Sequence, residues 1–359
     1  MENLKEGTDV IVAGAGIWGC TVARVCAEKG QKVLVLEKRP VVGGNVRCCI
    51  DEETGIEVHT YGSHIFHTHN RRVWDFIRRF TEFNGYQHKV LACYKGRVYH
   101  LPLGLTLINK FFGVELKPSE LDSFLTDERR QAIFDAFFRG YTSKQWGRPP
   151  EEIDPGIIKR VPVRNNYDTN YFNDYWQGIP SDGYNRLFER LLDHPNITVR
   201  CNEEFRLSDF GSGSKLRLYY SGPIDALFGY KYGPLPWRSL RFETETLDLA
   251  DYQGTSVVNY AEAEIPYTRI HEFRHYHPEQ TPKVAKTVIT REFPQAWKSG
   301  DEPYYPINSP ESAALLEKYR QEASRYPNLV IGGRLGEYRY YDMDQSVAKA
   351  LEIAEGGVK

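Results

Sequence analysis

The sequence predicts an α/β fold in which one parallel-sheet domain is interrupted by other structural units. A short apolar run at residues 8–14 is followed by a glycine-rich turn, a helical pattern ending at Gly30, and a second apolar run at residues 31–38. This strand–helix–strand succession of about 30 residues has the size of one βαβ unit. A strand pattern and a closing helix of the same kind return at residues 328–355. The patterns between these two ends differ, so the simplest interpretation is that other structural units are inserted into the parallel-sheet domain.

The elements between the two ends follow from periodicity and turn residues. Residues 71–83 and 118–141 carry apolar side chains at helical spacing. Residues 181–194 predict a helix with Ser181 or Asp182 as its N-cap, and residues 196–200 predict a strand. Residues 214–273 alternate as several strands separated by turns, and residues 311–326 predict another helix.

Composition and charge exclude several classes of protein. The chain has 359 residues, of which 41% are hydrophobic and 26% charged, as is ordinary for a globular protein. Its net charge of −2, without runs of like charge, gives no electrostatic case for nucleic acid or anionic lipid. The first apolar run is too short to span a bilayer and lacks a signal-peptide layout, so we expect a cytoplasmic protein. The six cysteines show no CxxC spacing and are expected to be reduced thiols.

The glycine-rich turn predicts a Rossmann-like dinucleotide site. Gly14, Gly16 and Gly19 form GxGxxG between a strand and a helix. The first glycine makes the turn, the second lets a pyrophosphate approach the backbone, and the third lets helix and strand pack closely. Glu37 lies 23 positions after Gly14 (37 − 14), where a carboxylate can bind the ribose hydroxyls.

Two further features favour FAD over a nicotinamide cofactor. The stretch after Glu37 contains Lys38, the pair Gly43 and Gly44, and Asn45, and it resembles the extended fingerprint of FAD proteins. The closing helix begins near Asp342–Asp344, and in FAD proteins of this architecture its N-terminus points at the pyrimidine end of the flavin. FGSGSK at residues 210–215 lacks the third glycine and a following helix, so it predicts a hairpin turn and not a second nucleotide site.

Seven motifs resemble the UDP-galactopyranose mutase family, of the shorter bacterial type, along nearly the whole chain. In order they are YGSHIFHT, FFRGYTSKQWG, IIKRVPVRNNYDTNYFND, SGPIDALFGY, PYTRI, PYYPI and GRLGEYRYYDMD. The resemblance implies a Rossmann-like FAD-binding domain at residues 1–80, 180–230 and 325–359. It also implies a helical domain at 100–150 and an antiparallel β-sheet substrate domain at 81–99, 151–179 and 231–324. A homodimer or higher homo-oligomer is expected, with neither a nucleic acid nor a membrane as partner.

The resemblance also implies a reaction, the interconversion of UDP-galactopyranose and UDP-galactofuranose through a covalent flavin N5–galactose intermediate on reduced FAD. The leaving diphosphate calls for guanidinium groups. The residues that the family assigns to catalysis and substrate binding are Arg160, Arg269, Tyr305, Tyr340, Tyr141, Trp146, Asn170, Tyr171 and Phe172. Arg334, Asp342 and Met343 fall in its C-terminal flavin loop. On composition alone Arg164 could replace Arg160; only the motif separates them.

Three histidines crowd into six positions, 64–69. Such crowding suggests zinc, but on a strand His67 and His69 share one face and His64 takes the other, which makes joint coordination awkward, so we expect no metal. By resemblance, His64 is the flavin-side catalytic histidine, His67 is structural and His69 is solvated. His88 stands where the family pattern leads one to expect asparagine, and we expect it to contact substrate.

Two alternatives from other classes remain. One is an FAD-dependent oxidase or desaturase of the amine-oxidase type, which shares the FAD scaffold but has no need of a diphosphate clamp. The other is a flavin-containing binding protein without catalysis.

Overall fold

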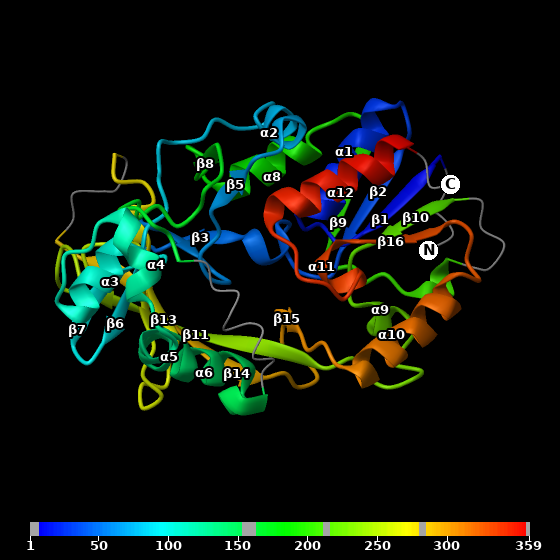
Figure 1. The fold of residues 1–359 in the computed structure, drawn as a ribbon. Coiled ribbons are helices and arrows are strands. Elements are labelled where there is room, and N and C mark those ends of the chain that lie inside the picture. Colours follow the sequence, from blue (N-terminus) through cyan, green and yellow to red (C-terminus); the bar gives the residue numbers. More distant parts are fainter. Residues whose placement is uncertain (1–6, 153–162, 211–215, 280–284, 357–359) are drawn as a thin grey trace.

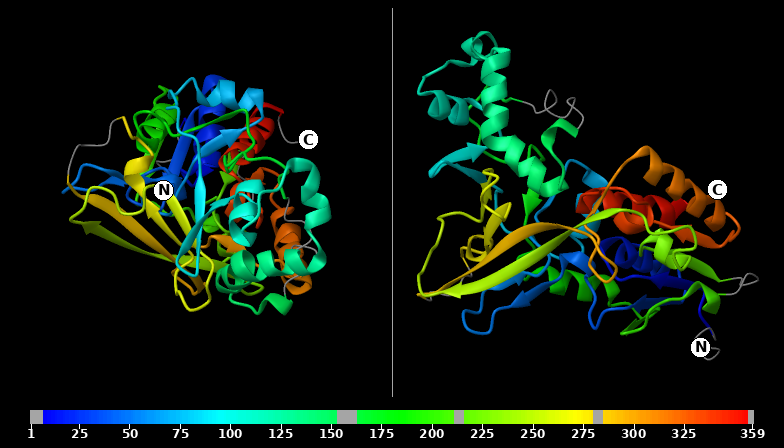
Figure 2. Two further views of the ribbon diagram at one scale, coloured as in Figure 1. Left: turned by 60° about the vertical axis from the view of Figure 1, so that its left-hand side comes forward. Right: turned by 90° about the horizontal axis from the view of Figure 1, so that it is seen from below.

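The structure is a computed structural model that describes residues 7–152, 163–210, 216–279 and 285–356. Two large sheets dominate it, one of five strands and one of seven. The five-stranded sheet with its helices lies at one end of the molecule, and helices α3 and α4 with strands β6 and β7 lie at the other (Figure 1). Figure 2 shows the long antiparallel pair of β11 and β14 running between these two ends.

The five-stranded sheet is parallel throughout, in the order β16-β10-β1-β2-β9. Its strands are β1 (Val10–Ala13), β2 (Val33–Glu37), β9 (Ile197–Cys201), β10 (Arg217–Tyr220) and β16 (Leu329–Ile331). One face packs on α1 (Ile17–Glu28), α8 (Tyr184–Leu192) and α12 (Met343–Gly356), and α2 (Arg71–Ile77) joins the same core. The other face packs on residues 205–210 and on α9 (Ile224–Leu227). This sheet confirms the predicted α/β class.

The seven-stranded sheet has the order β15-β11-β14-β13-β12-β6-β7. Its strands are β6 (Val90–Tyr94), β7 (Arg97–Leu101), β11 (Trp237–Leu247), β12 (Val257–Tyr260), β13 (Arg269–Glu272), β14 (Thr287–Ala296) and β15 (Tyr305–Pro306). All neighbouring pairs are antiparallel except β12 with β6, which are parallel. Two segments far apart in the chain, residues 90–101 and 237–306, therefore build one sheet.

Helices α3 (Leu105–Phe112), α4 (Leu121–Phe124) and α5 (Asp127–Phe134) pack with β6 and β7 on a small core. Helix α6 (Gly140–Trp146) follows and contacts β14. The helical spacing of residues 118–141 is divided among several helices in the structure, because the Thr126 side chain accepts from the Arg129 amide and starts a new helix. The turn Asp135–Arg139 is π-helical, and Gly147 ends α6 with φ +62°.

Two other helical predictions need correction. Helix α2 ends at Ile77 and not at residue 83. The N-cap of α8 is neither Ser181 nor Asp182 but Gly183, whose φ is +83°. A side chain there would meet the Glu57 carboxylate, 2.8 Å from an added Cβ, and that carboxylate accepts from the Tyr184 amide at 3.3 Å. A distant side chain therefore caps the helix.

Short hairpins and helices complete the chain. Strand β3 (Cys48–Ile50) pairs with β4 (Glu57–His59), and β5 (Phe66–Thr68) pairs with β8 (Trp176–Gly178). Helices α10 (Pro310–Ala323) and α11 (Gly333–Gly336) precede and follow β16. The hairpin turn predicted at residues 210–215 falls mostly outside the described residues. Among the described helices, none has the length and apolar character needed to cross a membrane.

Candidate active site

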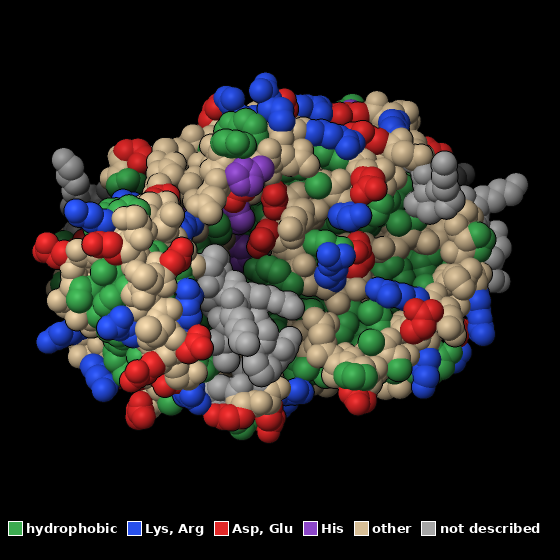
Figure 3. Space-filling view, viewed as in Figure 1, with side chains coloured by type: hydrophobic (Ala, Val, Ile, Leu, Met, Phe, Trp, Pro, Cys, Tyr) green, Lys and Arg blue, Asp and Glu red, His purple; other side chains and the backbone are tan. Residues whose placement is uncertain are grey.

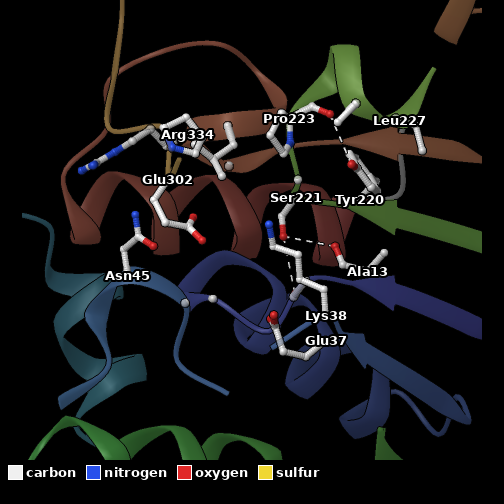
Figure 4. A pocket seen from close by; sticks show the side chains of 18 of the residues that line it. Ala13, Glu37, Lys38, Asn45, Tyr220, Ser221, Pro223, Leu227, Glu302 and Arg334 are labelled. Atoms are coloured by element: carbon white, nitrogen blue, oxygen red, sulfur yellow. Dashed lines mark hydrogen bonds between the residues drawn. The ribbon is translucent and has the colours of Figure 1, made fainter. Parts of the chain in front are cut away.

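A cavity of about 630 Å³ opens at the carboxyl ends of the parallel strands. Ala13, Glu37 and Ser221, at or just after the ends of β1, β2 and β10, lie on one wall. Arg334 and Glu302 face them from across the cavity (Figure 4). Ligands of open parallel sheets bind outside these strand ends, and this volume suits a cofactor.

The glycines of the first turn have the geometry that a pyrophosphate site requires. Gly14 has φ +102°, and α1 begins directly after Gly16. A Cβ added at Gly19 would lie 2.0 Å from the Gly14 carbonyl oxygen, so only glycine permits this packing of helix on turn. Gly44 is equally confined, because a Cβ there would lie 3.0 Å from the Gly16 Cα. The two glycine loops therefore touch.

Glu37 is buried at the end of β2. Its carboxylate accepts from the Ala15 amide at 2.8 Å and from the Arg39 amide at 3.0 Å. A carboxylate has about four acceptor positions, so two stay available for a ligand. Glu37 thus fixes the glycine turn while it faces the cavity. Of the other residues predicted to bind the cofactor, the cavity wall contains Gly14, Gly16, Lys38, Gly43, Gly44, Asn45, His64, Arg334 and Met343.

Three buried nitrogens on this wall have no hydrogen-bond partner among the described residues. They are Trp18 Nε1, Arg39 Nη1 and His64 Nδ1. Buried polar atoms without partners are costly, and their concentration on one cavity points to a polar ligand. A dinucleotide fits this wall, because the glycine turn suits its pyrophosphate, Glu37 its ribose, and the three nitrogens its remaining polar atoms.

A second group of side chains surrounds Arg269 at the start of β13. Its guanidinium donates to the Tyr141 hydroxyl from α6, and its Nε lies 3.3 Å from the Glu292 carboxylate of β14. Burial alone would lower the pKa of Arg269, but Glu292 and two tyrosines hold it well above the usual value. Burial would raise the pKa of Glu292, and Arg269 and His271 lower it. The pair is ionised, and 28% of the Arg269 side chain stays exposed to a ligand.

The C-terminal loop supplies more polar groups next to Arg269. The rings of Tyr305 and Tyr340 stack with centroids 6.0 Å apart, and Arg334 lies over the Tyr340 ring at 4.7 Å. Asp342 accepts from the Tyr340 hydroxyl at 3.2 Å. Burial raises the pKa of Tyr305 and of Tyr340, so both hydroxyls remain protonated donors at neutral pH. The structure thus brings together five predicted residues from β13, β15, α6 and the loop after α11.

The three histidines of residues 64–69 have different partners. His64 is on the cavity wall, and burial together with nearby Arg334 lowers its pKa to about 4, so the ring is neutral. His67 stacks on Phe172 at 3.7 Å and binds Asp174 at 2.8 Å. His69 is 55% exposed, 3.4 Å from Asp174. Figure 3 shows histidine side chains at the edge of a hollow in this face and inside it.

The segment of residues 163–172 lies against His88. The Arg164 guanidinium donates to the Asn170 carbonyl at 2.6 Å and to the Tyr171 carbonyl at 3.3 Å, so Arg164 holds the backbone of this segment. His88 is buried, with its ring 5.4 Å from Phe172, and burial lowers its pKa to about 3. Tyr171 is 41% exposed. Asn170, Tyr171 and Phe172 are thus presented together, with Phe172 the most enclosed by other rings.

The structure says little about two of the predicted site residues, Arg160 and Trp146. Sequence reasoning missed a third residue, Lys144, which supports the backbone next to the site. Arg160 falls in residues 153–162, outside the described part of the chain. Trp146 is half-buried at the end of α6. On the same helix, the Lys144 ammonium lies 2.8 to 3.0 Å from four carbonyl oxygens in the segment before Arg269. This lysine is inside the motif FFRGYTSKQWG, but its partners lie more than 110 positions away.

Comparison with known proteins agrees with this geometry. The profile of UDP-galactopyranose mutases matches residues 136–340, and that of NAD(P)-binding Rossmann-like domains matches residues 12–80. The chain is 39% identical to a probable UDP-galactopyranose mutase of Klebsiella pneumoniae, over 97% of this chain and 94% of that one. It is 37% identical to a dTDP-fucopyranose mutase of Escherichia coli, over 98% of both. A crystal structure of reduced UDP-galactopyranose mutase has the same fold, with a TM-score of 0.75, 18% identity and coverage of 98% and 96%.

Proposed function

The chain belongs to the UDP-galactopyranose mutase family of isomerases, and from this premise we propose that it interconverts UDP-galactopyranose and UDP-galactofuranose on reduced FAD. The observation that carries the proposal is the group of Arg269, Tyr141, Tyr305 and Tyr340, with Arg334, beside a dinucleotide cavity. An oxidase acting on amines or carbon chains has no use for such an anion-binding group.

Each part of the group has a task in the reaction. Arg269 receives the diphosphate as it leaves the anomeric carbon, and Tyr305 and Tyr340 donate hydrogen bonds to it. The diphosphate must stay bound because it returns at the end of the cycle, and Arg160 is the second guanidinium proposed to hold it. The glycine turn, Glu37 and the C-terminal loop would hold FAD, which in its reduced form would supply the nucleophile for the anomeric carbon. His64 is neutral, so it serves as a hydrogen-bond partner beside the sugar and not as a fixed charge.

Two further proposals concern the organisation of the protein. The division into an FAD-binding domain (1–80, 180–230, 325–359), a helical domain (100–150) and a substrate domain (81–99, 151–179, 231–324) is supported by the two separate large sheets. The family resemblance supports a homo-oligomer in the cytoplasm.

A second substrate is favoured by one comparison. The relative named dTDP-fucopyranose mutase covers the chain as fully as the first relative does, at nearly equal identity. A 6-deoxy sugar on dTDP carries the same diphosphate, so the Arg269 group would serve it equally. The two substrates differ in the base, in the 2′-hydroxyl of the ribose and at the sugar C6, and we propose that the segment around Tyr171 and His88 make the contacts that tell them apart.

Anaerobic turnover tests the proposal. Purified holoenzyme is incubated with UDP-galactofuranose, with and without dithionite, and the two UDP-sugars are resolved by chromatography; dTDP-fucopyranose is run in parallel. We expect UDP-galactose interconversion only with dithionite. Conversion of the dTDP sugar alone would reassign the substrate within the family. If folded, flavin-loaded protein converts neither sugar, the mutase proposal is contradicted and the oxidase alternative is favoured.

A further inference from the structure

A series of hydrogen bonds extends from the Glu292 partner of Arg269 through His271 to Ser63 and Tyr276. Arg269 and His271 lie two positions apart on β13, so their side chains share one face of the strand. His271 Nε2 lies 3.1 Å from the Glu292 carboxylate, and His271 Nδ1 lies 2.5 Å from the Ser63 hydroxyl. Ser63 in turn accepts from the Tyr276 hydroxyl. The series therefore links Arg269 to the loop that carries His64.

The partners determine which hydrogen each atom carries. Glu292 is ionised, so His271 donates to it from Nε2, and Nδ1 is left as an acceptor for the Ser63 hydroxyl. Thr268 also donates to Glu292, at 3.2 Å. Every polar side-chain atom in this series of hydrogen bonds has a partner when His271 is neutral.

The same series of hydrogen bonds also accommodates a protonated His271. Hydroxyl groups rotate, so Ser63 can accept a hydrogen bond from Nδ1 and turn its own hydrogen toward Tyr276, whose hydroxyl can then donate to Ser256. The carboxylate of Glu292 already accepts from Nε2, and this hydrogen bond becomes stronger when the imidazole is a cation. Neither protonation state leaves a buried group unpaired, which is uncommon for an imidazole without exposed surface.

The groups that face His271 come from several elements. Arg269 is on its own strand and Glu292 on β14; three further imidazoles act on it from the adjoining segments, those of His59, His64 and His88. Burial lowers the pKa of these three rings to between about 3 and 4, so they are neutral near pH 7. Burial also lowers the pKa of His271, against the pull of Glu292. In the free protein the charges of Arg269 and Glu292 thus cancel.

We propose that Ser63 and His271 are positioning residues that act through Glu292 on Arg269, and that His271 takes up one proton from solvent when a nucleotide diphosphate binds there. The inference rests on the proposed function, because it requires the diphosphate at Arg269. A diphosphate brings two negative charges next to a neutral pair, and this favours the charged form of a nearby imidazole. The added proton leaves the group with a net positive charge toward the ligand.

The expected signature is an affinity that falls as pH rises. A single linked proton lowers affinity by up to tenfold per pH unit, between the pKa values of His271 in the free and bound protein. UDP-galactopyranose is the probe, since its diphosphate does not titrate near neutral pH, whereas the terminal phosphate of UDP does. The oxidised holoenzyme is used so that binding is measured without turnover.

Calorimetry in two buffers of different ionisation enthalpy counts the protons taken up. We expect uptake in the wild type and none in His271→Gln, whose amide can donate to Glu292 but cannot be protonated. Ser63→Ala should reduce uptake, because a protonated Nδ1 would then lack an acceptor, and this variant serves if His271→Gln does not fold. His100→Asn, an exposed histidine on β7, is the matched control and should behave as wild type.

Each other result has a definite meaning. Proton uptake that persists unchanged in His271→Gln, or in Ser63→Ala should the former not fold, overturns the inference. Binding without uptake in the wild type overturns it as well, while the proposed substrate stands. Failure of the wild-type holoenzyme to bind UDP-galactopyranose would refute the proposed substrate, and the inference with it.

Discussion

Replacing Lys144 with methionine should loosen the active site from a position that contacts no ligand. The Lys144 ammonium lies 2.8 Å from the carbonyl oxygens of Tyr260 and Glu262, 3.0 Å from that of Ile265 and 2.9 Å from that of Tyr267. These carbonyls belong to the segment that leads into β13. Methionine matches the length of the lysine chain but has no donor, so all four carbonyls lose the ammonium, while that of Glu262 keeps another donor, the Ile265 amide at 3.3 Å.

The magnitude follows from the number of hydrogens. An ammonium has three N–H groups for the four carbonyls, and each hydrogen bond contributes about 1 kcal/mol or slightly more because Lys144 is half-buried. The variant should therefore lose about 3 to 4 kcal/mol. With an unfolding entropy of about 2.1 cal/mol/K per residue, 359 residues have about 0.75 kcal/mol/K, and the melting temperature falls by about 4 to 5 °C for a cooperative transition.

Thermal melting of the holoenzyme and steady-state turnover of UDP-galactofuranose test this reasoning together. Lys110→Met is the matched control, since Lys110 donates to a single exposed carbonyl and its loss should shift the melting temperature by about 1 °C or less. We expect Lys144→Met also to lower kcat/KM, because Tyr141 lies one turn away on α6 and binds Arg269. A melting temperature and kcat/KM equal to those of the control would refute the role given to the four carbonyls.

Four shorter predictions test other parts of the site. Arg269→Ala should nearly abolish turnover while flavin absorbance is retained; near-wild-type kcat/KM would remove its role. His64→Ala should reduce kcat more than His69→Ala, and the reverse order would contradict the account of the loop. Glu302 lies 2.6 Å from the Arg39 guanidinium beside the cavity, so Glu302→Gln should speed flavin release severalfold in a dialysis assay. His59, His64 and His88 are buried with lowered pKa values, so below pH 6.5 the unfolded chain binds more protons at these residues than the folded one does. The melting temperature should therefore fall on acidification toward pH 5. A melting temperature that does not change with pH would contradict these pKa values.

The parts of the fold that were predictable depend on short-range geometry. The turn of Gly14, the packing of Gly19 and the bonds of Glu37 involve residues within about 25 positions, and each carries a local signature in the sequence. The cap of α8 was predicted wrongly for the opposite reason. Its partner is Glu57, 127 positions from Tyr184, and no local pattern announces it. Residue type and spacing predict what a segment does by itself, and they do not reveal which distant side chain completes it.

The same limit explains the crowded histidines and what surrounds them. The family motifs indicate Arg269 and His64, but the hydrogen-bond partners around them come from distant parts of the chain: Tyr141 lies 128 positions from Arg269, and Ser63, next to His64, lies 208 positions from its partner His271. The loop of residues 60–65 joins β4 to β5, and loop and strand together contact the parallel-sheet side, the seven-stranded sheet and the segment of residues 163–174. Each of these three surfaces is contacted by a different polar side chain: His64 faces the cavity, Ser63 binds His271, and His67 binds Asp174. The density of polar residues in this stretch thus reflects the number of surfaces that meet there.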